Sequence, residues 1–157
     1  MTSPVTSPEP QRPSEPAAAA LFDALTVEHA TVYGYGIVSA RSTPEDNYLV
    51  AKAITAHRDH REALLSMLER RGVEAPLVAP GYQLPMQVDD AADAANLALR
   101  MENDAAVAWR AVVEQTDNSD ERTYAVSALT QSAVDAAHWR QVLKIWPVTS
   151  AFPGGAE

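Results

Sequence analysis

An apolar repeat with alternating steps of four and three residues recurs in four segments of this sequence. Such steps keep side chains on one face of an α-helix, so each segment predicts an amphipathic helix with one buried seam. Polar residues of metal-binding type interrupt every seam near its middle. They are Glu28 in the first segment, His57 and His60 in the second, Glu102 in the third, and Asp135 and His138 in the fourth. The repeat therefore predicts four helices around a core that contains one polar layer.

Composition supports a single all-α domain. The 157 residues suffice for one domain with a substantial core and are too few for two domains of ordinary size. Apolar residues make up 46% of the chain but aromatic residues only 6%, and many of the apolar residues are alanines. Alanine favours closely packed helices, whereas sheets are rich in branched and aromatic residues. We therefore expect helices rather than a sheet.

The charge and the residue types of the chain exclude several classes of function. A formal net charge of −9 repels phosphate groups, so neither nucleic acid nor an anionic membrane is an expected partner. Without cysteine the chain has no disulfide and no thiolate metal site, which leaves oxygen and nitrogen ligands. No segment has the pattern of a signal peptide or a membrane span, so we expect a cytoplasmic protein.

Prolines, glycines and capping residues divide the chain into a bundle with two irregular ends. Five prolines among Ser, Thr and Glu predict that residues 1–16 form a disordered tail. Thr43 and Pro44 match an N-cap and a first helical residue, Gly72 fits a helix C-cap, and Pro147 ends the last helix.

The first two helices are expected at about residues 17–41 and 44–71. The third should start at Asp89 or Asp90 and end near residue 116, and the fourth, capped by Asn118 or Ser119, should end near residue 145. The bundle would then span 17–146 and precede an irregular tail at 147–157.

The connection over residues 72–88 sets the expected topology. Its prolines and Gly81 exclude regular helix and favour an extended path. About 17 residues at about 3.1 Å each reach roughly 50 Å, whereas a helix of about 27 residues spans only roughly 40 Å. The connection can therefore return along the whole bundle, and we expect a four-helix bundle with one long crossover between helices two and three.

The turns place the polar residues at common heights. Glu28 and His57 are equally distant in sequence from the turn at residues 42–43, so the two side chains are expected in one layer of the first hairpin. Glu102 and Asp135 are nearly equidistant from the turn at residues 118–119. His60 lies three residues after His57, and His138 lies three residues after Asp135. Each histidine therefore shares a helical face with the residue before it. All six side chains are therefore expected near the middle of the bundle.

This arrangement resembles the diiron-carboxylate proteins of the ferritin-like superfamily, which place a Glu on each of two helices and a Glu-x-x-His motif on each of the other two. The matching segments are Glu28 and Glu102, the pair Asp135-Ala-Ala-His138, and His57-Arg-Asp-His60, which has a histidine where the family pattern has a carboxylate. More narrowly, the chain is similar to a family of alanine-rich actinobacterial ferritin-like proteins. That resemblance covers about residues 17–146 and implies a fold but no established activity.

The resemblance implies a metal-binding protein with a redox or metal-handling role. Its metal ligands would be the six residues Glu28, His57, His60, Glu102, Asp135 and His138, and its cofactor one or two ions of iron or manganese. Because position 57 is a histidine, the layer has only three carboxylates, those of Glu28, Glu102 and Asp135. Their charge of −3 does not balance the +4 charge of two divalent ions, which four carboxylates would balance. A single ion, a labile pair and a lost site therefore all remain open, as do the substrate, the metal and the oligomeric state.

An alternative explanation needs no metal. Buried carboxylates and histidines can satisfy one another as an ion-pair network, since leaving each unpaired would cost roughly 1–3 kcal/mol. In that case the chain is a catalytically silent bundle for self-association or partner docking. Among the other seam residues, Gln131 is expected as a structural amide, and Tyr35, Trp109 and Tyr124 as core aromatics. His29 points about 100° away from Glu28 and is expected at a helix interface or on the surface.

Overall fold

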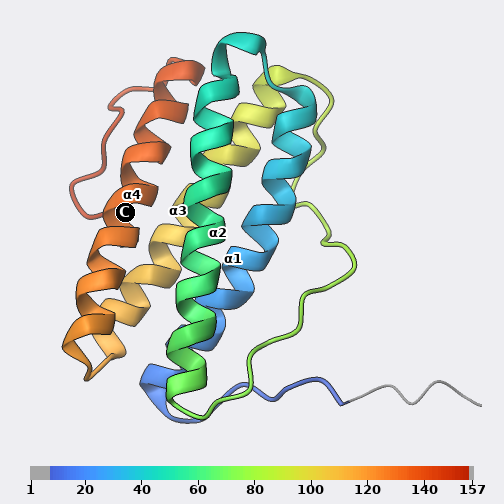
Figure 1. Ribbon diagram of the computed structural model, residues 1–157. Helices are drawn as coiled ribbons and strands as arrows, with labels where there is room; N and C mark the ends of the chain where they lie inside the picture. Colours follow the sequence, from blue (N-terminus) through green and yellow to red (C-terminus); the bar gives the residue numbers. More distant parts are fainter. Residues whose placement is uncertain (1–7, 156–157) are drawn as a thin grey trace, which may run out of the picture.

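The computed structural model describes residues 8–155 and contains four long helices (Figure 1). These are α1 (Pro16–Arg41), α2 (Asn47–Arg70), α3 (Ala91–Gln115) and α4 (Ser119–Leu143), with a short 3₁₀ turn, η1 (Pro44–Asp46), before α2. No strand occurs among the described residues. The prediction of an all-α four-helix bundle is confirmed.

Local capping chemistry sets the ends of the helices. The side chain of Asp90 accepts a hydrogen bond from Asp93 N at the start of α3, and Asn118 accepts two from the first turn of α4. Each is one of the two residues that the sequence offers at that helix start. Gly72 has a φ of +66° just after α2, which is the left-handed conformation of a glycine C-cap. The main chain therefore begins and ends most helices close to the predicted residues.

The predicted start of α2 at Pro44 is wrong. Pro44 begins the 3₁₀ turn η1 instead, and α2 starts at Asn47. The Thr43 hydroxyl forms no cap to the backbone but donates to the Asp46 carboxylate at 2.9 Å. That side-chain contact favours the tighter turn over a regular helical start. The Glu28 and His57 layer is nevertheless preserved.

The connection between α2 and α3, over residues 71–90, crosses the length of the bundle beside α1 (Figure 1). Because the chain returns to the end where α2 began, α2 and α3 run in the same direction and α1 and α4 in the opposite one. Helix α1 packs against α2 and α3, and α4 packs extensively against α3 but much less against α2. Every packed pair is therefore antiparallel, and the predicted long crossover is confirmed.

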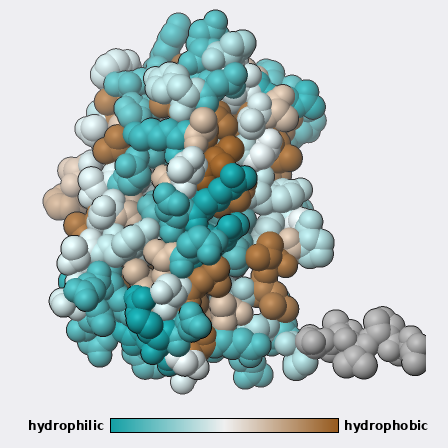
Figure 2. Space-filling model, in the orientation of Figure 1, coloured by the Kyte–Doolittle hydropathy of each residue, from teal (hydrophilic) through white to brown (hydrophobic). Residues whose placement is uncertain are grey.

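The core consists of two apolar clusters. One lies toward the N-terminal end of α1 and contains Leu25, Leu64 and Trp109. The other lies toward the C-terminal end of α1 and contains Val38 and Trp139. On each helix the predicted polar residues lie between members of the two clusters. The polar layer therefore separates two apolar halves, while the outer face seen in Figure 2 is mostly hydrophilic.

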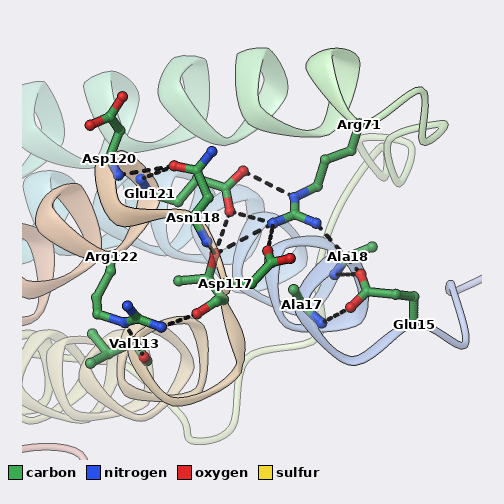
Figure 3. A network of polar contacts seen from close by, with 11 residues as sticks. Glu15, Ala17, Ala18, Arg71, Val113, Asp117, Asn118, Asp120, Glu121 and Arg122 are labelled. Carbon is green, nitrogen blue, oxygen red and sulfur yellow. Dashed lines mark hydrogen bonds and ion pairs between the residues drawn. The ribbon is translucent and has the colours of Figure 1, made fainter.

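A half-buried arginine, Arg71, joins three segments at one end of the bundle (Figure 3). The Arg71 guanidinium donates to both carboxylate oxygens of Glu121, at 3.0 and 2.8 Å, and to Asp117 at 3.0 Å. Arg71 Nη1 also lies 3.6 Å from Glu15 Oε2. Burial alone would raise the pKa of Glu121, but the hydrogen bonds from Arg71 and Thr116 lower it. The network fixes the end of α2 against the start of α1 and the α3–α4 turn.

The predicted disorder of residues 1–16 falls partly on residues 1–7, which lie outside the described residues, and it stays a prediction. Within residues 8–15, Arg12 pairs with Asp23 at 2.7 Å, and Glu15 accepts hydrogen bonds from Ala17 N and Ala18 N as the N-cap of α1. The predicted C-terminal tail has no helix or strand as far as residue 155. None of the described helices combines the length and hydropathy that crossing a bilayer requires.

We predict that Glu15→Ala destabilises the bundle. Losing an N-cap costs about 1 kcal/mol, which lowers Tm by roughly 2–4 °C in a domain of this size. Thermal melts measure the change. Glu9→Ala is the matched control, because Glu9 lies in the same segment but makes no hydrogen bond or ion pair with the described residues. Equal melting points for the two variants would show that the cap contributes nothing.

Candidate metal centre

Three of the predicted ligands come together in the polar layer. Helix α1 supplies Glu28 and α2 supplies His57 and His60, and one donor atom from each lies within 4.8 Å of the others. His57 Nδ1 is 2.6 Å from Glu28 Oε2, and His60 Nδ1 is 3.3 Å from Glu28 Oε1. All three residues are buried. The predicted shared layer of Glu28 and His57 is confirmed, and we call these residues the Glu–His–His triad.

The opposite side of the His57 ring contacts Glu102 of α3. His57 Nε2 lies 3.1 Å from Glu102 Oε1, and the same oxygen accepts a hydrogen bond from the Tyr35 hydroxyl. The second oxygen, Oε2, is buried and has no hydrogen-bond partner among the described residues. The fourth predicted ligand therefore contacts the triad through His57 and has one unsatisfied oxygen.

Two tryptophans complete the hydrogen bonds of this layer. Trp109 Nε1 donates to Glu28 Oε1 at 2.7 Å, and Trp139 Nε1 donates to the Tyr35 hydroxyl at 3.0 Å. Tyr35 and Trp109 lie in the core, as their seam positions predict, but their hydrogen bonds to acidic residues were not predicted from the sequence. The available signal was chemical, because a buried indole or phenol usually finds an acceptor, and carboxylates supply most acceptors in these seams.

The surroundings of His57 favour the charged form of its ring. Burial by itself lowers the pKa of His57, but the hydrogen bonds to Glu102 and Glu28 outweigh burial and raise the pKa to about 10. Burial likewise raises the pKa of Glu28, yet its contacts with His57 and His60 lower it to about 2. Burial and the Glu102 charge keep the pKa of Tyr35 well above its ordinary value. The layer therefore holds an imidazolium between two carboxylates.

The two predicted ligands on α4 form a separate cluster. Asp135 Oδ1 lies 3.6 Å from Lys52 Nζ and 3.7 Å from His138 Nδ1, and Asp135 Oδ2 accepts a 2.8 Å hydrogen bond from Gln131. Gln131 thus holds one oxygen of Asp135 from one turn away on α4, and its role as a structural amide stays a prediction. Neither Asp135 nor His138 belongs to the triad, and their binding of a metal stays a prediction.

The triad has the donor set of a metal centre. Two imidazoles and one carboxylate bind zinc in several hydrolases and iron(II) in oxygenases, with coordination positions left open. His60 Nδ1 is buried without a hydrogen-bond partner among the described residues, as is Glu102 Oε2. An ion at the triad would satisfy His60 Nδ1 directly. The described residues therefore fit a single ion, provided that His57 releases a proton.

Comparison with known proteins places the chain in a family. The family model described as "Domain of unknown function (DUF4439)" matches residues 20–157, and the chain belongs to this family. It is also similar to the crystal structure of a conserved hypothetical protein, rv2844, from Mycobacterium tuberculosis. The two share 61% sequence identity over 87% of this chain and 96% of that chain, with a TM-score of 0.80. No curated protein matches the chain.

The charges of the layer predict a stability that depends on pH. His57 has a folded pKa of about 10 against an ordinary value of 6.5, so its contribution is complete below about pH 6.5 and is lost as pH rises through 10. Glu28 has a folded pKa of about 2 against 4.5, so its contribution is present above about pH 4.5 and is lost as pH falls. Urea unfolding of the metal-free protein between pH 3 and 10 should therefore show greatest stability between pH 4.5 and 6.5.

The control for this prediction is His57→Gln, which removes the titrating ring. It should unfold more easily at pH 6 but lack most of the alkaline decline. An equal decline in both proteins would assign it to other groups.

Proposed function

We propose that this chain is a ferritin-like metal-binding protein whose Glu–His–His triad binds one first-row transition metal ion. The observation that carries this proposal is the buried set of Glu28, His57 and His60 donor atoms within 4.8 Å of one another. Buried charged groups are rare unless they pair or bind a metal. A carboxylate and two imidazoles at the centre of an apolar bundle are therefore a candidate binding site.

The topology supports the ferritin-like part of the proposal. The hairpins α1–α2 and α3–α4 joined by one long crossover are the arrangement of ferritin-like bundles, in which metal ligands come from facing helices. The polar layer of this chain lies at the corresponding place, between two apolar clusters. The triad departs from the diiron pattern because His57 replaces a carboxylate, which favours one ion over two.

Ligand chemistry narrows the metal to iron, manganese or zinc, and the ferritin-like resemblance favours iron or manganese. An ion with open coordination positions supplies Lewis acidity or binding of oxygen species, which is the basis of a redox or metal-handling role. The protein residues orient the ligands. Trp109 holds Glu28 through Oε1, and the apolar clusters on both sides of the layer exclude water from it.

A second function is favoured by a different observation. Both oxygens of Glu28 and both ring nitrogens of His57 have polar contacts without any metal. The same residues can therefore form a permanent ion-pair network in a catalytically silent bundle. In that case the fold would serve self-association or docking of a partner. The two functions differ in what happens when a metal is offered.

We predict that the chain binds one Fe²⁺, Mn²⁺ or Zn²⁺ ion with release of the His57 Nδ1 proton. Calorimetry near pH 7 in two buffers of different ionisation enthalpy would measure the stoichiometry and the proton release. Glu28→Gln and His60→Asn should weaken binding by at least about tenfold, since even the partners of a metal ligand change affinity by about 10–100-fold.

The matched control for the metal titration is His138→Asn, which alters a histidine outside the triad. It should bind nearly as tightly as the unaltered chain. Two ions per chain, with the second lost in His138→Asn, would instead extend the site to all six predicted residues. No binding heat with any of the three ions would contradict the metal-binding function.

His57→Glu separates the two functions. Without metal it places a third carboxylate between Glu28 and Glu102 in place of a cation, which should destabilise the bundle by about 3–5 kcal/mol. If the layer binds metal, added Fe²⁺ or Mn²⁺ should raise the Tm of the variant, because a cation would then neutralise part of the charge of the three adjacent carboxylates. A loss of stability that metal does not restore would favour the silent bundle. His57→Gln, of similar size but neutral, is the control for loss of the ring.

A further inference from the structure

A line of hydrogen bonds connects one residue from each of the four helices across the polar layer. Trp139 Nε1 of α4 donates to the Tyr35 hydroxyl of α1 at 3.0 Å, and this hydroxyl donates to Glu102 Oε1 of α3. Glu102 Oε1 in turn contacts His57 Nε2 of α2 at 3.1 Å. All four side chains are at most 1% exposed. Water is therefore excluded as a competing partner along the line.

The direction of each hydrogen bond in this line follows from the indole at one end and the carboxylate in the middle. An indole nitrogen can only donate, so the Tyr35 oxygen must accept from Trp139 and direct its own proton to Glu102. An ionised carboxylate can only accept, so His57 Nε2 must carry a proton. When the His57 ring is neutral, its lone pair is then on Nδ1. That nitrogen is the one that faces Glu28.

Aromatic packing holds the plane of the His57 ring. Tyr35 stacks on His57 with ring centroids 5.5 Å apart and an interplanar angle of 28°. A half-turn of the imidazole about Cβ–Cγ would keep this stack but would put a ring carbon in the place of each nitrogen, so the contacts with Glu28 and Glu102 would both be lost. Tyr35 therefore acts on His57 in two ways: its ring packs on the face of the imidazole, and its hydroxyl donates to Glu102 Oε1, the oxygen that His57 Nε2 contacts.

We infer that Tyr35, Trp139 and Glu102 are positioning residues for metal binding, which hold His57 as the Nε2–H tautomer and present Nδ1 to an ion at the triad. The inference rests on the proposed function, because the triad must bind metal for the tautomer to matter. A hydrogen bond from the second nitrogen of a ligating histidine to a carboxylate is a general means of fixing tautomer and ring orientation. Here the acceptor is itself fixed by Tyr35 and, through Tyr35, by a residue on the fourth helix.

The other side of the triad provides a matched control. Tyr124 is also a tyrosine beside a triad histidine. Its ring lies edge-on to the His60 ring, with the two ring centroids 6.1 Å apart. Among the described residues, its hydroxyl has no hydrogen bond to any acid of the layer. Tyr124→Phe thus removes the same atom as Tyr35→Phe without touching the line of hydrogen bonds.

The test compares Tyr35→Phe, Trp139→Phe and Tyr124→Phe in the full chain, with Zn²⁺ as a diamagnetic probe. Competition titrations would measure Zn²⁺ affinity, and long-range ¹H–¹⁵N NMR of the imidazoles would identify the tautomer of His57, assigned through His57→Gln. We expect the unaltered zinc form to show metal-bound Nδ1 and a protonated Nε2 that exchanges slowly. Tyr35→Phe should lose affinity by about 10–100-fold and exchange the Nε2 proton faster. Trp139→Phe should also weaken Zn²⁺ binding and speed exchange of the Nε2 proton, but by smaller factors. Tyr124→Phe should change neither the affinity nor the exchange rate.

The outcomes separate this inference from the proposed function. Failure of the unaltered chain to bind Zn²⁺, Fe²⁺ or Mn²⁺ would overturn the proposed function and the inference with it. Zinc bound through His57 Nε2, or equal affinity and proton exchange in Tyr35→Phe and Tyr124→Phe, would overturn the inference alone. A purely structural role for Tyr35 would lower Tm and leave the NMR signature unchanged, which also contradicts the inference. If Tyr35→Phe does not fold, Trp139→Phe decides by the same two measurements.

Discussion

The charged bridge from Glu28 through His57 to Glu102 is the interaction on which the rest of this structure depends. It joins α1, α2 and α3 with contacts of 2.6 and 3.1 Å, in a place where water cannot replace a lost partner. Removing one member of such a bridge leaves a buried charge uncompensated, which costs far more than an exposed ion pair contributes. The geometry of the layer is therefore narrowly defined, and the helices must pack at a fixed height to satisfy it.

The same bridge links the metal-free and metal-binding interpretations. Without metal, the proton on His57 Nδ1 neutralises part of the charge on Glu28, and the layer is nearly self-sufficient. A metal ion would occupy the space of that proton and also satisfy His60 Nδ1, which has no hydrogen bond among the described residues. Proton and metal thus compete for one position. A bundle with such a layer is stable before it is loaded, which distinguishes it from small domains that fold only around their metal.

The crossover and the Arg71 network hold the bundle around this layer. Because the chain between α2 and α3 returns along the molecule, every packed pair of helices is antiparallel, and residues of equal height can meet across hairpins. Arg71 fastens one end of α2 to the α3–α4 turn and lies near the first residues of α1. The weaker packing of α4 on α2 leaves Asp135 and His138 in a cluster with Lys52, beside the triad and not within it.

The amino-acid sequence by itself determined four helices, the C-cap at Gly72, the long crossover, and the common height of Glu28 and His57. All of these follow from local rules, namely helical periodicity, capping chemistry and counting from a turn. Only the tertiary structure decided that Lys52 approaches Asp135, that Glu102 meets the far side of the His57 ring, and that Tyr35 and Trp109 donate to carboxylates. These contacts depend on how far each helix is rotated and translated against its neighbours. A period of four and three residues defines a face but leaves rotation within that face undetermined, and a hydrogen bond requires a position accurate to a few tenths of an ångström.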